Sequence, residues 1–98
     1  MGEVRWTAEA ARWLHEIHQH IAQDNPEAAL RTVRGIHQLA ESLVAFPERG
    51  FPYQRQPERG IRVLLYGHYR IAYLVKSNGD IDVLGVFHGA LDITRDLG

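Results

Sequence analysis

Apolar residues in the first half of the chain recur at intervals of three and four, which is the period of an amphipathic helix. A short alternating stretch at residues 3–6 comes first, and Thr7 then stands where a helix N-cap is expected. Glu9 falls in the first turn, where a carboxylate complements the helix dipole. The apolar positions that follow are Ala10, Trp13, Leu14, Ile17 and Ile21. The pattern predicts a short strand followed by a helix that ends near Asp24.

A second helix is predicted directly after the first. Asn25, Pro26 and Glu27 form a start signal, because asparagine caps a helix and proline fits its first position without losing a needed donor. The apolar positions of this helix are Ala29, Val33, Ile36, Ala40 and Leu43. Pro47 is expected to end it just after Phe46. Since so short a connection joins antiparallel neighbours, the two helices are expected to pack as a hairpin.

Beyond residue 46 the helical period is lost. Residues 47–60 hold three of the four prolines together with Gly50 and Gly60, which predicts a loop. Stretches with the period of strands follow at residues 61–66, 69–75 and 81–87, and Asn78-Gly79 between the last two is a strong hairpin signal. The expected order is β-α-α-β-β-β. This is an α+β fold in which a helical hairpin packs on a small antiparallel sheet, within one domain over residues 1–98.

Two-residue turns would place apolar side chains on both faces of this sheet. One face would carry Arg62, Leu64, Tyr66, Tyr69, Ile71, Tyr73, Leu84, Val86 and His88. The other would carry Ile61, Val63, Leu65, Arg70, Ala72, Leu74, Val83, Gly85 and Phe87. Two helices cover only one face, so the other is expected to contact a chain tail, a second copy or a foreign chain. A shifted register, or a 47–60 loop folded over the sheet, would also explain the pattern.

Composition narrows the chemistry. The chain has no cysteine, which excludes disulfides, thiolate metal sites and cysteine nucleophiles. No apolar run approaches the roughly 20 residues that span a bilayer, and the N-terminus lacks the features of a secretory signal, so a cytoplasmic location without membrane contact is expected. Lys76 is the one lysine among 11 cationic side chains, and the net charge is −1. This balance argues against direct nucleic-acid binding, which usually needs a clustered basic excess.

A series of short motifs follows in order along nearly the whole chain. They are Val4-Arg5-Trp6-Thr7 with Ala10 and Leu14, Asn25-Pro26-Glu27-Ala28-Ala29, Phe46-Pro47-Glu48-Arg49-Gly50, Gly60-Ile61-Arg62, Tyr69-Arg70-Ile71-Ala72-Tyr73, Ile81-Asp82-Val83-Leu84, and Phe87-His88-Gly89-Ala90 followed by Asp92-Ile93. No single motif is diagnostic, but their succession resembles the ParE-like plasmid-stabilisation toxins of the RelE/ParE superfamily.

The resemblance implies the toxin of a type II toxin-antitoxin system, with the RelE/ParE fold and no cofactor. It also implies a cognate antitoxin, a separate chain with an extended or helical segment that wraps the toxin. Members resembling ParE poison DNA gyrase by binding and arrest growth, whereas those resembling RelE cut messenger RNA on the ribosome. We expect a ParE-like gyrase poison. The alternatives are a RelE-like endoribonuclease and a non-toxic relic that still binds antitoxin; a homodimer or a heterotetramer with the antitoxin is left open.

The candidate catalytic residues of a ribonuclease are Arg62, Arg70 and His88, because cleavage by a 2′-hydroxyl needs a base, an acid and cations near the phosphate. In the ribonuclease branch an arginine on the central strand and a histidine or tyrosine near the end of the last strand contribute, and Arg70 and His88 match these places. Two-residue turns, however, put Arg70 opposite Phe87 and on the other face from His88. The lysine-rich segment of many ribosome-dependent ribonucleases is also absent, so no catalytic residue is assigned with confidence.

The candidates for contact with the antitoxin or the target lie on the sheet and in the tail. They are Arg62, Tyr69, Arg70, Tyr73, His88, Asp92 and Arg95. The tail is expected to hold a short helical turn at residues 92–97. It has Leu91 where many relatives place an arginine before Asp92, and this difference leaves open the alternative of a non-toxic relic. No metal site is expected, because His15 and His18 are three rather than four residues apart and no third ligand is evident. They, like His37, are expected to be solvated helix residues.

Overall fold

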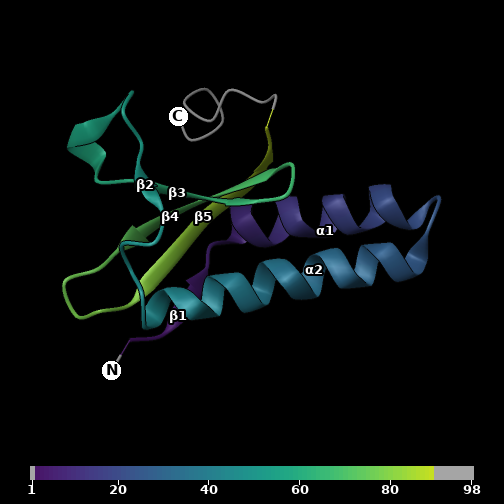
Figure 1. The fold of residues 1–98 in the computed structure, drawn as a ribbon, viewed down its shortest axis with the longest axis horizontal. Helices are drawn as coiled ribbons and strands as arrows, with labels where there is room; N and C mark the ends of the chain where they lie inside the picture. Colours follow the sequence, from purple (N-terminus) through teal and green to yellow (C-terminus); the bar gives the residue numbers. More distant parts are fainter. Residues whose placement is uncertain (1, 90–98) are drawn as a thin grey trace.

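A helical hairpin packs on one face of a five-stranded sheet in the computed structural model, which describes residues 2–89 (Figure 1). The elements are β1 (Val4–Trp6), α1 (Ala8–Ala22), α2 (Pro26–Glu41), η1 (Ser42–Val44), β2 (Phe51–Pro52), η2 (Pro57–Arg59), β3 (Arg62–Tyr66), β4 (Tyr69–Val75) and β5 (Ile81–His88). The predicted α+β architecture is therefore confirmed. The helical turn expected at residues 92–97 lies outside the described residues.

Both helices begin at the caps that the sequence predicts. The Thr7 hydroxyl oxygen accepts a hydrogen bond from the Ala10 amide at 3.1 Å, and the Asn25 side-chain oxygen accepts one from the Ala28 amide at 3.0 Å. The second helix ends at Glu41, before the predicted position, and continues as the 3-10 turn η1. Ser42 explains the change, because its hydroxyl donates to the carbonyl of the preceding turn and such local bonds compete with the helix.

The sheet has the order β1-β5-β4-β3-β2. The antiparallel meander of β3, β4 and β5 is present as predicted, and two strands extend it. β1 lies parallel to β5, with Val4 beside Ile81, so the sheet is mixed rather than purely antiparallel. β2 lies inside the segment predicted as a loop and pairs with β3. Two residues that include a proline show no period, which is why the sequence did not reveal this strand.

A β-bulge between β4 and β5 changes the predicted faces of two residues. Ala72 pairs with Gly85 and Tyr73 then pairs with Val83, so Leu84 is the extra residue on β5. Val83 consequently joins the core beneath the helices, whereas Leu84 packs on the opposite face. The two-residue-turn prediction placed them the other way round and is wrong at both, because a bulge shifts the side-chain alternation by one residue.

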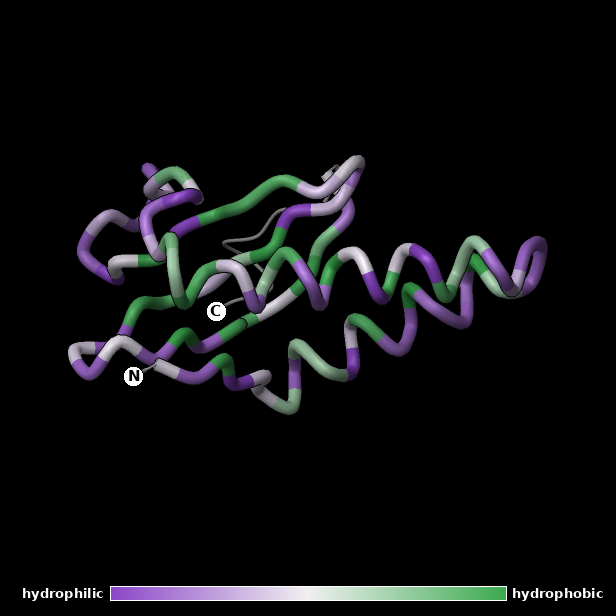
Figure 2. The backbone as a smooth tube through the Cα atoms, turned by 60° about the horizontal axis from the view of Figure 1, so that its bottom comes forward, coloured by the Kyte–Doolittle hydropathy of each residue, from purple (hydrophilic) through white to green (hydrophobic). Residues whose placement is uncertain are grey.

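Apolar side chains form a cluster on each face of the sheet. Along the backbone in Figure 2, hydrophobic and hydrophilic positions alternate in the helices, whereas the strands contain longer hydrophobic runs. The larger cluster lies under the helices and includes Ala10, Leu14, Ile36, Ala40, Leu43, Leu64, Ile71, Tyr73, Ile81, Val83 and Val86. The smaller cluster on the other face is formed by Ile61, Val63, Ala72 and Phe87.

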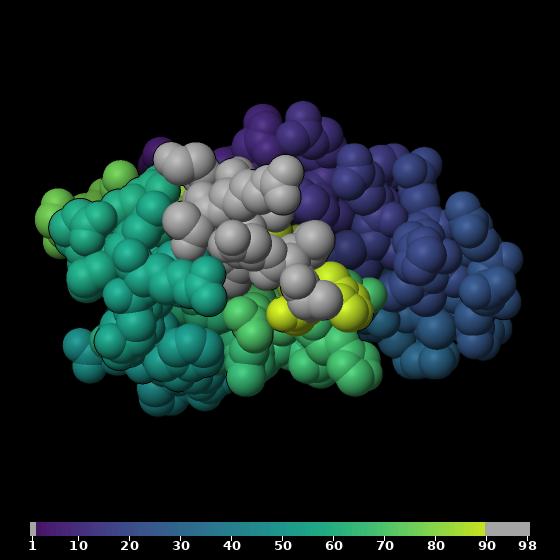
Figure 3. Space-filling model, turned by 90° about the horizontal axis from the view of Figure 1, so that it is seen from above, coloured from purple at the N-terminus to yellow at the C-terminus, as the bar shows by residue number. Residues whose placement is uncertain are grey.

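Residues of the chain itself cover part of this second face. Tyr53, from the segment after β2, and Trp13, from α1, pack against the smaller cluster, and the Trp13 ring centroid lies 5.2 Å from that of Phe87. Seen from above in Figure 3, the segment after β2 lies at one end of this face and the end of β5 at the other. The alternative in which residues 47–60 fold over the sheet is therefore realised in part. Leu65 is still 57% exposed on this face.

The β4–β5 turn binds the N-terminal segment. Asp80 accepts hydrogen bonds from the Glu3 amide at 2.9 Å and from the Asn78 side chain at 3.2 Å, and it forms an ion pair with Arg5 at 3.5 Å. The amide hydrogen bond from Glu3 is the main reason that the pKa of Asp80 lies below its ordinary value. The carboxylate thus joins the start of β1 to the turn before β5.

Within residues 2–89, neither helix is long and apolar enough to cross a bilayer.

Candidate functional site

Two of the candidate residues, Arg62 and Tyr73, hold the segment after α2 against the sheet. Tyr73 is fully buried, and its hydroxyl donates to the Pro47 carbonyl at 2.8 Å and accepts from the Gly50 amide at 2.9 Å. Burial raises the pKa of the Tyr73 hydroxyl, which keeps it protonated as a donor. Arg62 lies opposite Tyr73 and donates to the Gly50 carbonyl at 3.0 Å. Both side chains are thus engaged within the fold.

Tyr69, Arg70 and His88 lie at the other end of the sheet, around a hollow of about 390 Å³. The hollow is lined by Leu65, Gly67, His68, Tyr69, Arg70, His88 and Gly89. The ring centroids of His68 and His88 are 6.3 Å apart, and Tyr69 presents its ring edge-on to His88 at 6.0 Å. A hydrogen bond from the Gly89 amide to the His68 carbonyl, 2.7 Å long, joins the β3–β4 turn to the end of β5.

Arg70 has a different setting from the two rings beside it. It pairs with Leu65 and Phe87 across the strands, so its side chain leaves the sheet on the face opposite Tyr69 and His88, as predicted. Its guanidinium forms no ion pair or hydrogen bond with another described residue. Arg70 is thus a strand cation that no carboxylate within residues 2–89 pairs with.

The candidate set is therefore divided between the two ends of the sheet. Arg62 begins β3, whereas His88 is in register with Tyr69, which pairs with Tyr66 at the end of β3. Four residues along a strand correspond to roughly 13 Å. Arg62 does not join Arg70 and His88 around the hollow. The remaining candidates, Asp92 and Arg95, lie outside the described residues.

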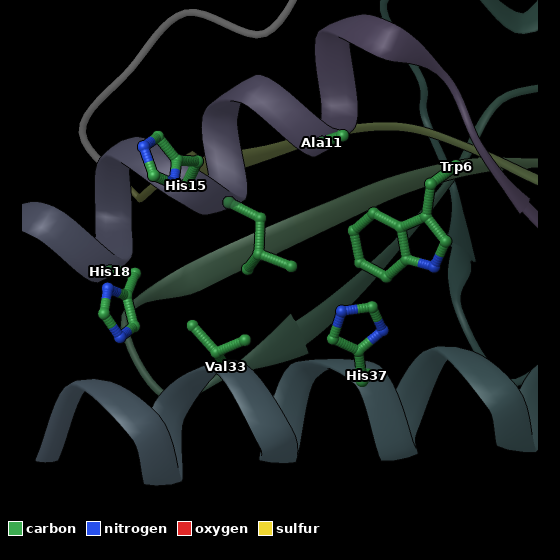
Figure 4. A pocket seen from close by; sticks show the side chains of 7 residues that line it. Trp6, Ala11, His15, His18, Val33 and His37 are labelled. Carbon is green, nitrogen blue, oxygen red and sulfur yellow. The ribbon is translucent and has the colours of Figure 1, made fainter. Parts of the chain in front are cut away.

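A hollow of about 580 Å³ that was not predicted lies between the two helices and β1 (Figure 4). It is lined by Trp6, Ala11, Leu14, His15, His18, Val33 and His37, and we call it the helix groove. Trp6 and His37 lie side by side, with ring centroids 4.7 Å apart, and Val33 separates them from His18.

The sequence contains a signal for the helix groove that the core pattern obscures. Ala11, His15 and His18 form a stripe beside the core stripe of α1, and Val33 and His37 form the equivalent stripe on α2. Three histidines on two helices suggest a metal site at first sight. Among residues 2–89, however, no three histidine or acidic side chains come together in a way that could hold a metal ion.

Comparison with known proteins identifies the family. A model of the ParE toxin of type II toxin-antitoxin systems, parDE, matches residues 4–93. This range includes every described strand and both helices. The chain belongs to the ParE toxin family.

One curated relative and two solved structures extend this result. This ParE-family toxin is 35% identical over 85 residues to "Putative toxin Y4kP" of Sinorhizobium fredii, a match that covers 87% of this chain and 85% of the relative. A structure described as the chromosomal ParDE toxin-antitoxin system from P. aeruginosa matches with a TM-score of 0.74 and 28% identity, over 90% of this chain and 96% of the other.

The second solved structure resembles the toxin in its fold alone. It is the toxin-antitoxin complex RelBE2 from Mycobacterium tuberculosis, with a TM-score of 0.67 and 24% identity, over 89% of this chain and 96% of the other. The ParE and RelE branches thus share this architecture, and the assignment of a target depends on individual side chains.

Proposed function

We propose that this ParE-family toxin acts by binding DNA gyrase and that a cognate antitoxin neutralises it by direct contact. The position of Arg62 is the observation that supports gyrase binding over RNA cleavage. A ribonuclease of this fold would need its cations and its acid and base around one phosphate. Arg62 instead donates to the Gly50 carbonyl at the far end of β3, away from Arg70 and His88.

The proposed partner follows from the family and its neighbours. The matching family is defined by a toxin that is paired with an antitoxin, and the two similar structures are described as a ParDE system and a RelBE2 toxin-antitoxin complex. The described surface also offers apolar area to a partner, since Leu30, Val44, Phe46, Phe51, Leu65 and Val75 are exposed. Under this proposal, the free toxin arrests growth and the antitoxin-bound form does not.

A second candidate function, RNA cleavage, is supported by the hollow at the end of β4 and β5. His68 and His88 would serve as base and acid, and Arg70, which also lines the hollow although its side chain leaves the opposite face of the sheet, would offset phosphate charge. This set has no second cation and no carboxylate among its lining residues. We therefore keep ribonuclease activity as the second candidate.

The test is inducible expression of the full chain in bacteria without antitoxin, scored for growth, trapped gyrase–DNA cleavage complexes and the integrity of messenger RNA. We expect growth arrest, accumulated cleavage complexes and intact messages. Co-expression of the cognate antitoxin should restore growth.

Two results would contradict the gyrase proposal in different ways. Arrest with cleaved messages and no gyrase complexes would establish the ribonuclease, and His68→Gln with His88→Gln should then abolish cleavage. Normal growth despite abundant folded protein would instead show that this chain is a non-toxic relic. In that case its binding to the antitoxin can still be measured directly.

A further inference from the structure

The face of the sheet opposite the helices, which we call the second face, is more buried than its described neighbours explain. Each member of its cluster is at most 2% exposed: Ile61, Val63, Ala72 and Phe87. Within residues 2–89, the apolar side chains from outside the sheet that pack on this cluster are those of Trp13, against Phe87, and Tyr53, beside Ile61. Val63 and Ala72 are paired between these two rings. Their burial points to a further covering segment.

The middle of the second face has little relief. The Phe87 ring folds back over Gly85, where a Cβ atom would collide with the ring. Ala72, which pairs with Gly85, adds only a methyl group. A glycine within a strand often marks a place where another backbone approaches closely. The second face can therefore accept a covering segment in close contact.

Cations lie at both ends of the second face. Arg70 is in register with Phe87 at one end, is partly buried, and forms no ion pair with another described residue. The segment after β2 carries Arg55 and Arg59 at the other end (Figure 3). Burial of a cation is costly unless a carboxylate pairs with it. The covering segment is therefore expected to carry carboxylates, one of them close to Phe87.

The sequence that follows β5 has these properties. With helical spacing, one side of residues 90–98 carries Ala90, Ile93 and Leu97, and the carboxylates of Asp92 and Asp96 lie beside this apolar stripe. The point at which the chain leaves the sheet is fixed by the Gly89 amide, which donates to the His68 carbonyl at 2.7 Å. Gly89 lines the same hollow as Arg70, so Asp92 follows within one helical turn of this cation.

The length of this segment also fits the second face. The cluster extends along β3 from the level of Leu65, which pairs with Arg70, to Ile61, and four residues of a strand correspond to roughly 13 Å. A helix over residues 90–97 is about 12 Å long, at about 1.5 Å per residue. It spans the cluster from the end of β5 to the segment after β2, with Leu65 at its edge, where that side chain stays 57% exposed.

We propose that residues 90–98 form a strap that folds back over the second face of the same chain, with Ile93 and Leu97 on the cluster and Asp92 paired with Arg70. The strap closes the second face, so another protein reaches Arg70 only after displacing it. Asp92, a candidate for contact with a partner, is then engaged within the chain. The inference goes beyond the proposed function and is independent of the target on which the toxin acts.

The first experiment uses Trp13 as a reporter of water at the second face, because its ring lies against Phe87. The chain has two tryptophans, so Trp6→Phe leaves Trp13 as the emitting residue of the full-length toxin. In this background, Leu97→Ser should shift the emission to longer wavelength, since it loosens the strap and admits water. Leu91→Ser is the matched control, because Leu91 lies on the opposite side of the predicted helix, and it should leave the emission unchanged.

The second experiment tests the ion pair by hydrogen exchange of the full-length toxin without antitoxin. Amides of residues 93–97 should exchange at least about tenfold more slowly than in the free peptide of the same sequence. Arg70→Asp and Asp92→Arg should each remove this protection, and the two together should restore it, because the pair is then re-formed with its charges exchanged. Protected amides in α1 show that each variant is folded.

Four results would overturn the inference. Equal shifts of Trp13 emission in Leu97→Ser and Leu91→Ser would show that the strap has no apolar side on the cluster. No recovery of protection in the charge-exchanged variant would remove the pair of Arg70 with Asp92. Protection that rises with toxin concentration would identify a second copy as the covering chain. Protection that appears only after the cognate antitoxin is added would assign the covering segment to that partner.

Discussion

At the scale of single residues, polar side chains of this toxin hold together segments that are far apart in sequence. Asp80 binds the Glu3 amide, and Tyr73 bonds with Pro47 and Gly50. Each is buried or nearly so, and a buried polar group stabilises a fold only while its partners are in place. Substitution at these positions should therefore affect stability rather than a binding surface.

Asp80→Asn should lower stability at neutral pH and alter its pH dependence. A carboxyl group whose pKa falls on folding adds stability above its unfolded pKa, and this stability is lost as the pH falls through the folded pKa. The wild-type toxin should therefore lose stability as the pH falls below about 4, the region of the ordinary pKa of 3.8, and Asp80→Asn should lose less over the same range. Urea unfolding at pH 7, 4 and 3 measures this.

Asp82→Asn is the control for Asp80. The Asp82 carboxylate is more exposed than that of Asp80, it pairs with Lys76 at 3.5 Å, and it bonds no backbone amide of the N-terminal segment. Equal effects of the two substitutions would show that Asp80 has no special part in holding β1.

Tyr73→Phe should cost about 1–3 kcal/mol in the free energy of unfolding, because the Gly50 amide and Pro47 carbonyl would lose their buried partner. Tyr69→Phe provides the comparison, since Tyr69 is only half buried and its hydroxyl forms no hydrogen bond with another described residue. Denaturant unfolding of both variants measures the difference. A loss as large for Tyr69→Phe would contradict the assigned role of the Tyr73 hydroxyl.

At the scale of elements, the side-chain alternation of β3 decides which residues are core. Leu64 lies under the helices and is 8% exposed, whereas Leu65 on the other face is 57% exposed. One residue of slippage would exchange these environments.

Leu64→Ala should therefore destabilise the toxin by about 2–5 kcal/mol and Leu65→Ala by less than about 1 kcal/mol. The two substitutions remove the same atoms, so their difference reports burial alone. Thermal or urea unfolding gives both values. Similar losses would show that β3 has a different register or that Leu65 is covered in solution.

Both helices and the strands of the meander could be predicted because capping and turn residues agree with the spacing of the apolar residues. Thr7 and Asn25 cap the two helices, and Asn78-Gly79 marks the last hairpin. The bulge at Leu84 was not predictable, since an extra residue leaves the composition of the strand unchanged. The same is true of the parallel pairing of β1 with β5, which joins residues about 77 positions apart through contacts that no local pattern encodes.

The candidate site was harder to predict than the fold for a related reason. Arg62 and His88 were expected on the same face, and the strand register places them roughly 13 Å apart along it. The helix groove depends on the distance between two helices and one strand, and its histidines belong to the polar part of each helical pattern. Sequence periodicity identifies a face, but not which faces meet.

At the scale of the whole molecule, β5 is the strand on which the sheet depends. It lies between β1 and β4, and it contributes Ile81, Val83 and Val86 to the core under the helices. Its removal would expose the inner edges of two strands at once.

A chain that ends at residue 75 should therefore be unfolded, although it keeps both helices and four strands. Hydrogen exchange should show unprotected amides in the truncated chain and protected amides in β4 and α1 of the full chain. Protection of α1 in the truncated chain would show that the hairpin folds without the sheet.

The parallel pairing of β1 with β5 joins a strand that is synthesised early to one that is synthesised late. During synthesis the first strand leaves the ribosome long before its neighbour in the sheet exists, and the helices meanwhile have only part of the surface on which they pack. A ribosome that stops before β5 releases a polypeptide without the finished fold. The surface of the folded toxin therefore forms only after β5 has been synthesised, and a partner that recognises the complete fold cannot bind the growing chain before that point.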